Sequence, residues 1–382
     1  MRALMTATVP SMIGQFNMNN IKLLQELGYE VDVACNFDDR SVWTDNKINE
    51  FKITLVQMNI SLFQIDFERK LTSLNHIKAY HQIKKLLNNR KYKLIHTHTP
   101  ISSLITRIAF KYSKIKCECT MIYTAHGFHF FKGNNPVKNW AFKAIEKIGA
   151  KQTDVLITIN KEDYEAAKKM HLRNKGRVEY VPGVGVDIDK VDSVKPDRGK
   201  LLNELGISRE CVLLLSVGEL NENKNHKYVI ECLPNLPRNF HYLICGCGKL
   251  EDIHKCLAKE IGVENRLHLL GYRNNIIEIM KSCDIFIFPS KREGLSVALM
   301  EAMACGLPCI VSNIRGNTDL INPDLNGYFL ELESKISKDI IDNCMSKKDS
   351  ISKNNMQLIK KYSKKSIADL MFEIYKGVSL ND

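Results

Sequence analysis

The sequence predicts an α/β protein made of two doubly wound domains with parallel sheets. The chain has 382 residues, more than one core of typical size requires. Short apolar runs alternate with amphipathic segments along its length, as in consecutive βαβ units. This alternation is interrupted once, at YVPGVGVD (180–187), whose proline and two glycines indicate a hinge. We therefore place one domain at residues 1–183 and the other at 184–359.

The individual elements follow from the same pattern. In the first domain, apolar runs predict strands at 3–9, 30–35, 94–98, 120–125 and 155–159, with helical spacing between them as at 17–27 and 73–87. In the second, strands are predicted at 212–218, 241–245, 267–269, 284–289, 309–312 and 327–330. The segment 360–382 reads as an amphipathic helix, which we expect to cross back and join the first domain.

Composition excludes several classes of protein. With 44% apolar and 26% charged residues the chain matches an ordinary soluble protein. We find no apolar run of the roughly 18 to 20 residues that a membrane span requires, and no signal peptide at the N-terminus, so we expect a cytoplasmic location. The twelve cysteines are scattered without a C-x-x-C pair, which favours reduced thiols over disulfides or zinc.

The net charge of +12 is confined to the first half of the chain. Residues 1–183 contain 28 Lys and Arg against 16 Asp and Glu, whereas residues 184–382 contain 27 of each class. Within the first half, residues 69–116 carry 12 basic residues and no acidic one. A solvated helical face, an anionic membrane surface and a phosphate-bearing acceptor all remain possible explanations. No recognition motif or aromatic interleaving accompanies the charge, so we expect no nucleic-acid partner.

One stretch, REGLSVALMEAMACGLP (292–308), combines an anion site with two carboxylates. It follows an apolar strand and continues into a helix, so the amides of Gly294, Leu295 and Ser296 are predicted at a helix N-terminus, where a diphosphate is favoured. Glu293 precedes this site, and Glu301 follows at most about 12 Å along the axis. Each carboxylate can accept two hydrogen bonds from a vicinal diol, which suits a nucleotide-sugar. The alternative is two partly exposed glutamates with no ligand.

These residues resemble the E-x7-E signature of retaining glycosyltransferases of family 4. Four other segments are similar to motifs of that family, in the family's order: YTAHGFHFF (123–131), VPGVGVD (181–187), SVGELNENKNH (216–226) and LLGYRNNI (269–276). The resemblance spans nearly the whole chain. The family members that the chain resembles act in bacterial capsule, exopolysaccharide or lipopolysaccharide synthesis. It implies the GT-B fold, in which two Rossmann-like domains face a cleft, with acceptor binding in the first domain and donor binding in the second.

The resemblance also implies roles for individual residues. Lys224 would neutralise the donor diphosphate, Glu301 would hold the ribose hydroxyls, and Glu293 would bind the transferred sugar. The full set of implied donor-binding residues is Gly14, Gly218, Lys224, Asn225, Tyr272, Arg273, Glu293, Gly294, Leu295, Ser296 and Glu301. Gly14 is placed in the first loop, TVPSMIG (8–14), where the family commonly has a glycine-rich loop near the donor phosphate. This chain has Glu219 where the family often has a cationic phosphate ligand, and either Arg273 or Arg315 could supply that charge instead.

Histidines are the candidates for the reacting centre and the acceptor side. By resemblance, His126 lies beside the anomeric carbon and, with Lys224 and Glu293, makes up the catalytic set. His98 and His129 are assigned to the acceptor side, although His129 could simply pack. His96 and His98 share one face of a strand, but a metal site would need a third ligand that the sequence does not offer. The D-x-D at 187–189 follows the hinge, which favours a structural role, so we expect no metal cofactor.

The resulting hypothesis is transfer of a hexose or N-acetylhexosamine from a UDP-sugar, with retention, to a polyprenyl-diphosphate-linked saccharide. The resemblance implies front-face attack, in which the leaving phosphate accepts the acceptor's proton. The basic stretch 69–116 and the amphipathic segment 135–151 suit peripheral docking on anionic lipid at the inner face of the plasma membrane. Two alternatives are a non-hydrolysing UDP-sugar 2-epimerase of the same fold and a non-catalytic nucleotide-sugar-binding subunit. The sequence does not indicate the oligomeric state.

Overall fold

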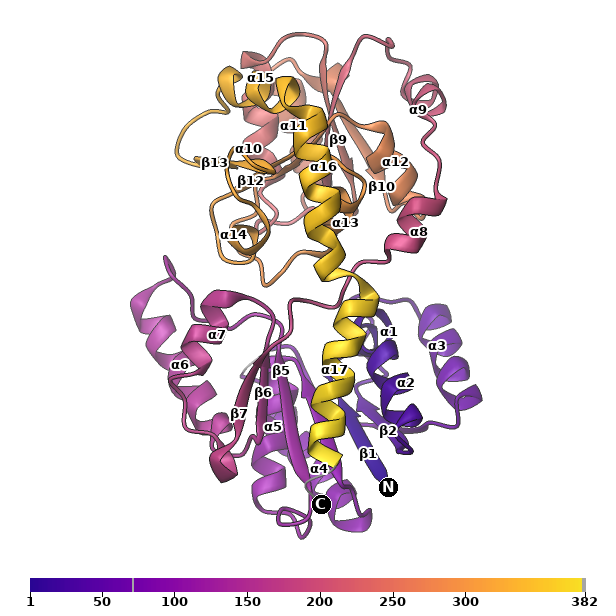
Figure 1. Ribbon diagram of the computed structural model, residues 1–382, viewed down its shortest axis with the longest axis vertical. Helices are drawn as coiled ribbons and strands as arrows, with labels where there is room; N and C mark the ends of the chain where they lie inside the picture. Colours follow the sequence, from indigo (N-terminus) through magenta and orange to yellow (C-terminus); the bar gives the residue numbers. More distant parts are fainter. Residues whose placement is uncertain (71, 380–382) are drawn as a thin grey trace. The chain divides into compact units, whose positions relative to one another are not determined.

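The computed structural model describes residues 1–70 and 72–379 and divides the chain into two compact units (Figure 1). Unit 1 contains Met1–Val184 together with the chain from Ile367 onward, and unit 2 contains Gly185–Ser366. The sequence assigned the tail from residue 360 to the first domain, which is wrong for its first seven residues. Lys360–Tyr362 forms a 3-10 helix, and the amide of Val186 donates to the carbonyl of Tyr362, which ties this segment to unit 2.

Unit 1 is built on a parallel sheet of seven strands in the order β3-β2-β1-β4-β5-β6-β7. Its strands are β1 (Arg2–Thr6), β2 (Glu30–Cys35), β3 (Ser61–Gln64), β4 (Leu94–His98), β5 (Thr120–Ala125), β6 (Val155–Thr158) and β7 (Arg177–Tyr180). The sequence missed β3 and β7, the two edge strands. Both have four residues and lack a continuous apolar run, because an edge strand is covered less completely than a central one.

The helices of unit 1 cover both faces of its sheet (Figure 1). They are α1 (Pro10–Phe16), α2 (Met18–Glu26), α3 (Asp45–Gln57), α4 (Asn75–Asn89), α5 (Pro100–Lys111), α6 (Pro136–Ala150), α7 (Lys161–Ala167) and α17 (Lys364–Ser379). Apolar residues of α17, including Met371 and Ile374, enter the same core as α1, α2 and α3. The C-terminal helix therefore joins the first domain as predicted, and it begins at Lys364 rather than at residue 360.

Unit 2 contains a parallel sheet of six strands in the order β10-β9-β8-β11-β12-β13. The strands are β8 (Val212–Val217), β9 (Phe240–Cys245), β10 (Leu267–Gly271), β11 (Ile285–Phe288), β12 (Cys309–Ser312) and β13 (Gly327–Leu330). All six were predicted, with end residues that differ by at most two positions. The strand order reverses between β8 and β11, so the loops that follow these two strands border a crevice at the carboxyl edge of the sheet.

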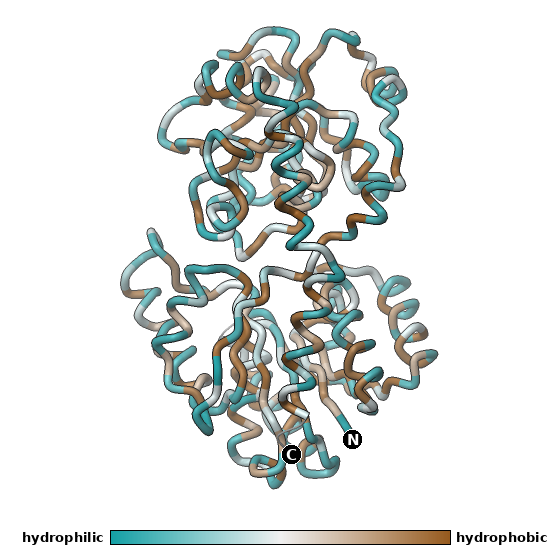
Figure 2. The backbone as a smooth tube through the Cα atoms, viewed as in Figure 1, coloured by the Kyte–Doolittle hydropathy of each residue, from teal (hydrophilic) through white to brown (hydrophobic). Residues whose placement is uncertain are grey.

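The helices of unit 2 are α8 (Ile188–Ser193), α9 (Arg198–Leu205), α10 (His226–Cys232), α11 (Glu251–Glu260), α12 (Ile276–Ser282), α13 (Val297–Ala304), α14 (Asn317–Leu320), α15 (Lys338–Ser346) and α16 (Lys348–Ile359). Figure 2 shows hydrophobic residues concentrated along the central strands and alternating with hydrophilic ones along many helices. This distribution is what two separate buried cores require.

Three further observations concern the sequence predictions. Gly14 lies inside α1 rather than in a loop, because Pro10 starts a helix directly after the short β1. A Cβ at Gly14 would lie 2.3 Å from the Trp43 ring, so close packing accounts for this glycine. All twelve cysteines are free thiols. None of the helices that the structure describes is long and apolar enough to cross a membrane.

Candidate active site

The two loops that border the crevice of unit 2 are joined by asparagine side chains. The amide of Asn223 donates to the carbonyl of Arg292 at 2.9 Å, and that of Asn225 to the carbonyl of Pro289 at 3.2 Å. Asn225 adopts a left-handed conformation, with φ of 54°, which asparagine tolerates better than most residues. The loop after β8 thus fixes the position of the loop after β11. The three asparagines of NENKN (221–225) are visible in the sequence, but their spacing does not show which groups they bind.

Lys224 and Glu293 lie within this pair of loops and contact each other. The Nζ atom of Lys224 donates to Oε1 of Glu293 at 2.7 Å, and it lies 4.5 Å from the centre of the Phe288 ring. Their side chains are only 18% and 12% exposed, so the ion pair is partly shielded from solvent. The sequence assigned both residues to the donor site, and the structure brings them together.

The backbone of the Glu293 loop is held by Arg315, which the sequence offered only as a phosphate ligand, and by Gly316, which it did not single out. Nε of the buried Arg315 donates to the carbonyl of Glu293 at 3.2 Å. Gly316 has φ of 82°, and a Cβ there would lie 2.3 Å from the carbonyl oxygen of Gly294. The two backbones approach this closely only because Gly316 has no side chain. The dipeptide Arg-Gly at 315–316 was the available signal, but glycine in a loop has many explanations.

Gly246 has the same role behind the loop that follows β8. A Cβ on it would lie 1.9 Å from the carbonyl oxygen of Gly218. Gly218 in turn packs against the stem of Lys224, where a Cβ would meet Cε at 2.9 Å. Gly218 thus leaves room for Lys224, since a side chain there would push Lys224 away from its present position.

The helix N-terminus that the sequence predicted is present. α13 begins at Val297, and its N-cap is Ser296, whose Oγ accepts from the amide of Leu299 at 3.4 Å. Gly294 and Leu295 precede the cap. The first amides of a helix have no acceptor within it, which favours an anion at this end. The hydroxyl of Ser296 is therefore engaged in capping, and only backbone amides are available for a phosphate.

Glu301 lies on the second turn of α13 and is half-buried. Burial raises the pKa of its carboxyl group above the usual value, and the nearby charges of Lys190 and Lys364 oppose that rise. Lys364 itself is bonded to Asp187 at 3.0 Å. A carboxylate in this setting is a good acceptor for hydroxyl groups, because a neutral diol can solvate it without displacing a paired cation.

The loop predicted to bind the base follows β10. Tyr272 is 72% exposed, and Arg273 forms an ion pair with Glu204 of α9. The sequence left open whether Arg273 or Arg315 replaces the cation that Glu219 does not provide. Arg315 is bonded to the loop that carries Glu293, whereas Arg273 is neutralised by a different element, so the geometry favours Arg315.

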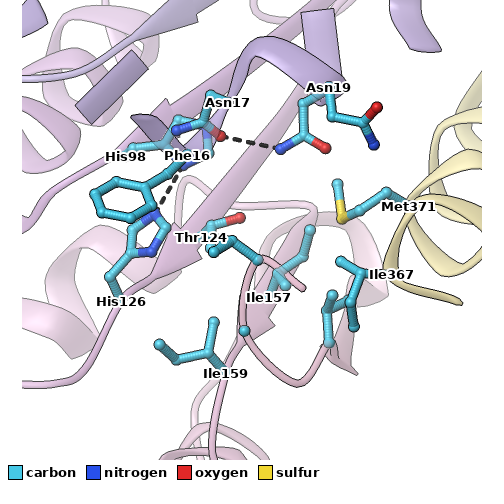
Figure 3. Close-up of a pocket in the computed structure, with 14 residues that line it drawn as sticks. Phe16, Asn17, Asn19, His98, Thr124, His126, Ile157, Ile159, Ile367 and Met371 are labelled. Carbon is cyan, nitrogen blue, oxygen red and sulfur yellow. Dashed lines mark hydrogen bonds between the residues drawn. The ribbon is translucent and has the colours of Figure 1, made fainter. Parts of the chain in front are cut away.

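In unit 1, His98 and His126 line a pocket at the carboxyl ends of β4 and β5 (Figure 3). Phe16, Asn17 and Asn20 come from the α1–α2 junction on one side of it. The opposite wall is apolar, with Ile157 from β6, Ile159 just after that strand and Met371 from α17. Polar groups facing an apolar wall suit a sugar ring, which presents hydroxyl groups at its edge and C–H groups on its faces.

The two histidines that line this pocket are in contact with each other, and His98 also contacts a third, His96. Nδ1 of His98 is 3.1 Å from Nε2 of His126, and the rings of His96 and His98 lie 4.1 Å apart. His96 also bonds Tyr375 at 2.7 Å and Thr124 at 2.8 Å. Burial lowers the pKa of His96 to about 3 and that of His126 to about 4, and it lowers the pKa of His98 well below its usual value. All three rings are therefore neutral near pH 7.

His129 is not brought to this pocket. Its ring packs 5.2 Å from that of Phe142, and its carbonyl accepts from Asn134 at 3.1 Å. The sequence assigned His129 to the acceptor side with packing as the alternative, and in the structure its ring packs against Phe142 and does not line this pocket. Among the described residues, no three His, Cys, Asp or Glu side chains are grouped so that they could hold a metal ion.

Comparison with known proteins identifies the family of this chain. Residues 197–365 match the model for glycosyl transferases group 1, and residues 13–160 match the model for glycosyl transferase 4-like proteins. The putative glycosyltransferase EpsD of Bacillus subtilis is 30% identical over 336 residues, which are 87% of this chain and 84% of that protein. The chain belongs to the group 1 glycosyl transferases. It is a glycosyltransferase, and the family that the sequence motifs suggested is confirmed.

One further relative and one solved structure are similar to this glycosyltransferase. The UDP-Gal:α-D-GlcNAc-diphosphoundecaprenol α-1,3-galactosyltransferase of Escherichia coli is 29% identical over 354 residues, covering 88% of this chain and 87% of that protein. The crystal structure of Anabaena HepE in complex with UDP has a TM-score of 0.74 at 18% identity, covering 99% of this chain and 100% of that one. The structural likeness confirms the predicted fold of two parallel-sheet α/β domains.

Proposed function

We propose that this glycosyltransferase moves a hexose or N-acetylhexosamine from a UDP-sugar to a hydroxyl group of a polyprenyl-diphosphate-linked saccharide, with retention, in bacterial surface polysaccharide synthesis. The name of the Escherichia coli relative specifies a UDP-linked sugar, a diphosphoundecaprenol-linked acceptor and an α-linked product. UDP-hexoses carry α-linked sugars, so an α product from such a donor means retention. These features come to the present chain as a proposal.

The Lys224–Glu293 ion pair is the observation that carries the proposal. A diphosphate bound at the N-terminus of α13 would offer Lys224 a more highly charged partner than Glu293. Once Lys224 turns to the phosphates, the carboxylate of Glu293 is released to accept hydrogen bonds from the sugar hydroxyls. Donor binding thereby exchanges one internal ion pair for two contacts with the ligand.

The same residues supply the charge that the leaving group needs. Lys224 and the amides that begin α13 stabilise negative charge on the diphosphate, and Arg315 lies on the neighbouring loop. We propose that these groups act without a divalent metal. Glu301 would accept hydrogen bonds from the ribose hydroxyls, and the loop at Tyr272 and Arg273 would bind the base. His126 would contact the reacting sugar, and the pocket of unit 1, with His98, would serve the acceptor side.

Glu293 is poorly suited to act as a nucleophile. In the donor complex proposed above, its carboxylate accepts hydrogen bonds from the sugar hydroxyls, and its backbone carbonyl is fixed by Arg315. Retaining glycosidases instead place a nucleophilic carboxylate about 5 Å from an acid partner. We therefore propose front-face attack, in which the acceptor oxygen bonds the anomeric carbon as the phosphate oxygen leaves, and that phosphate oxygen takes the acceptor's proton.

Mass spectrometry of the reaction products tests the proposal. The protein is incubated with UDP-galactose, UDP-glucose and their N-acetylated forms, with and without a short polyprenyl-diphosphate saccharide. We expect the acceptor to gain one sugar and UDP to be released. Glu293→Gln should slow transfer by about 100-fold while the protein still binds UDP. Glu222 is 85% exposed, and the control variant Glu222→Gln should leave the rate of transfer unchanged. Epimerised UDP-sugar formed without acceptor, or no product from any donor, would overturn the proposal.

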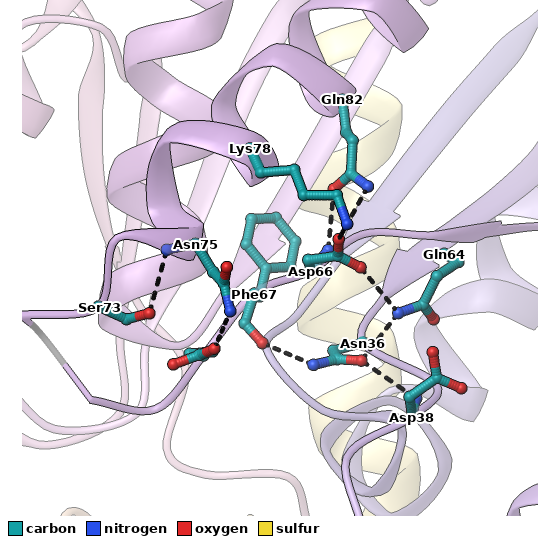
Figure 4. A network of polar contacts seen from close by, with 10 residues as sticks. Asn36, Asp38, Gln64, Asp66, Phe67, Ser73, Asn75, Lys78 and Gln82 are labelled. Carbon is teal, nitrogen blue, oxygen red and sulfur yellow. Dashed lines mark hydrogen bonds and ion pairs between the residues drawn. The ribbon is translucent and has the colours of Figure 1, made fainter.

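We also propose that unit 1 docks peripherally on anionic lipid. Part of the basic stretch 69–116 is neutralised internally: Lys78 pairs with Asp66 in a network with Gln64 and Gln82 (Figure 4), and Arg90 pairs with Asp32. These ion pairs support a structural role for Lys78 and Arg90, so the proposed docking rests on other cations of unit 1. Helix α6 gives a clearer indication of the docking face.

Helix α6 turns three large apolar residues toward solvent. Val137 and Trp140 are each 75% exposed and Ile148 is 59% exposed, while Glu146 faces inward and bonds Arg107 at 3.2 Å. Because Glu146 is the only acid of this helix, its outer face carries cations alone, namely the exposed Lys138, Lys143 and Lys147. An exposed apolar stripe flanked by lysines is typical of a helix that lies in the interface of an anionic bilayer.

A further inference from the structure

The hydrogen bond between His98 and His126 requires that one of the two rings carries the proton that they share. Nδ1 of His98 and Nε2 of His126 are 3.1 Å apart, a distance at which one nitrogen donates and the other accepts. Both rings are neutral near pH 7, so each has one N–H and one lone pair. The single proton between them belongs to either His98 or His126, and the rest of the structure decides which.

The surroundings of Nε2, the other ring nitrogen of His98, indicate which ring donates. Nε2 is buried and has no hydrogen-bond partner among the residues that the structure describes. If His126 donated, His98 would carry its proton on Nε2, and a buried N–H would be left without an acceptor. If His98 donates from Nδ1, only a lone pair is left bare. Unpaired N–H groups are the rarer of the two in protein interiors, so donation from His98 is the lower-energy arrangement.

Neighbouring groups keep the His98 ring in this orientation. Its face lies 4.1 Å from the ring of His96, which is held at both of its own nitrogens by Tyr375 and Thr124. His98 is 1% exposed and His96 is fully buried. A ring flip would place a carbon atom where Nδ1 now meets His126 and would break that bond.

We propose that His98 is a positioning residue that holds His126 in the tautomer whose proton is on Nδ1. His126 then presents an N–H donor to a ligand and has its lone pair occupied by His98. It can donate a hydrogen bond to a sugar hydroxyl, but it cannot accept a proton as a general base. The assignment of the tautomer stands on geometry alone, whereas its use in sugar transfer rests on the proposed function.

Nitrogen-15 NMR of the full chain, labelled at histidine, tests the tautomer directly. At pH 7 the wild-type protein should show His126 protonated at Nδ1 and unprotonated at Nε2, with its signals assigned by their loss in His126→Gln. The amide of His98→Asn can donate from near the position of Nδ1, so this variant should keep the tautomer. His98→Leu removes the donor, and His126 should then be protonated at Nε2 in a detectable fraction.

Activity provides the second measurement. Loss of one hydrogen bond predicts about a tenfold lower rate of transfer for His98→Leu, while His98→Asn should stay within about threefold of wild type. A wild-type His126 protonated at Nε2 would overturn the proposal, as would equal loss of activity in both variants with the tautomer unchanged. If the tautomer is as predicted but no donor is transferred, the proposed function fails and the positioning of His126 by His98 stands.

Discussion

Lys224 and Glu293 neutralise each other across two loops, with 2.7 Å between Nζ and Oε1. They are 69 residues apart in the sequence, which implied a phosphate-binding role for Lys224 and a sugar-binding role for Glu293. Their contact links these two roles, because any anion that attracts Lys224 also changes the environment of Glu293. The first prediction follows from this link.

Lys224→Met should weaken binding of UDP by about 10- to 100-fold, because it removes a charge-assisted contact to the diphosphate. Isothermal titration calorimetry measures the affinity. Lys227→Met is the matched control, since Lys227 lies one turn further on, is 60% exposed and pairs with Glu231. Equal affinity in the two variants would remove Lys224 from the donor site.

Gly316→Ala should destabilise unit 2 and weaken donor binding together. The new methyl group would lie 2.3 Å from the carbonyl oxygen of Gly294, and φ at this position is 82°. Gly262→Ala is the control, because its φ of 69° imposes similar strain but no atom lies within 4 Å. We expect Gly316→Ala to cost about 1–3 kcal/mol more than the control. Urea unfolding followed in unit 2 measures the difference, and equal stability would show that the close approach is unimportant.

The affinity for UDP should depend on the ionisation of Glu301. Burial raises the pKa of this carboxyl group, so it becomes protonated at a higher pH than an ordinary glutamate. A protonated carboxyl accepts fewer hydrogen bonds from the ribose, and affinity should fall as the pH is lowered through its pKa. Titrations of wild type and Glu301→Gln across acidic pH test this. The variant should bind more weakly at neutral pH and lose this pH dependence, and a parallel pH profile for both proteins would contradict the assignment.

Much of the fold could be predicted because apolar runs in central strands are long and unmistakable. The exceptions have a common cause. β3 and β7 lie at the sheet edges, where partial exposure dilutes the pattern, and Gly14 was assigned to a loop because a proline-started helix directly after a strand leaves little signal. The packing of Gly14 on Trp43 depends on a residue 29 positions away. No local pattern contains that information.

Acidic pH should destabilise unit 1. In the unfolded chain the histidines take up protons below about pH 6.5, whereas the folded chain keeps His96 neutral to about pH 3 and His126 to about pH 4. Each contributes stability that is lost as the pH falls from 6.5 toward these values, by about 1.4 kcal/mol per pH unit at the steepest. Hydrogen exchange of unit 1 amides measures it. His96→Gln should reduce the slope and the exposed His171→Gln should not; an unchanged slope in His96→Gln would count against the assignment.

Trp140→Ala should weaken binding to anionic vesicles by about tenfold, because the exposed indole is the largest apolar group on the outer face of α6. Co-sedimentation with phosphatidylglycerol vesicles measures the bound fraction at low and high salt. Ile253→Ala, at a 57% exposed position of unit 2, is the matched control. We expect high salt to release the wild-type protein. Binding that is indifferent to lipid charge, or equal for both variants, would exclude α6 as the docking face.

The candidate site was predictable to a different degree in its two parts. Glu293 and Glu301 were assigned to a donor site from their strand-loop-helix context together with the family resemblance, and Lys224 from the resemblance alone. Arg315 and Gly316 act through the backbone of the Glu293 loop, and such contacts have no sequence spacing. Likewise, His98 and His126 end adjacent strands, but only the register of β4 on β5 brings their rings together.

The stereochemistry of the product tests the central claim most directly. The protein is supplied with the UDP-sugar that it uses and a polyprenyl-diphosphate saccharide, and the new linkage is examined by NMR at its anomeric proton. Front-face transfer from an α-linked donor predicts an α linkage. A β linkage would show inversion and would contradict the account of the donor site.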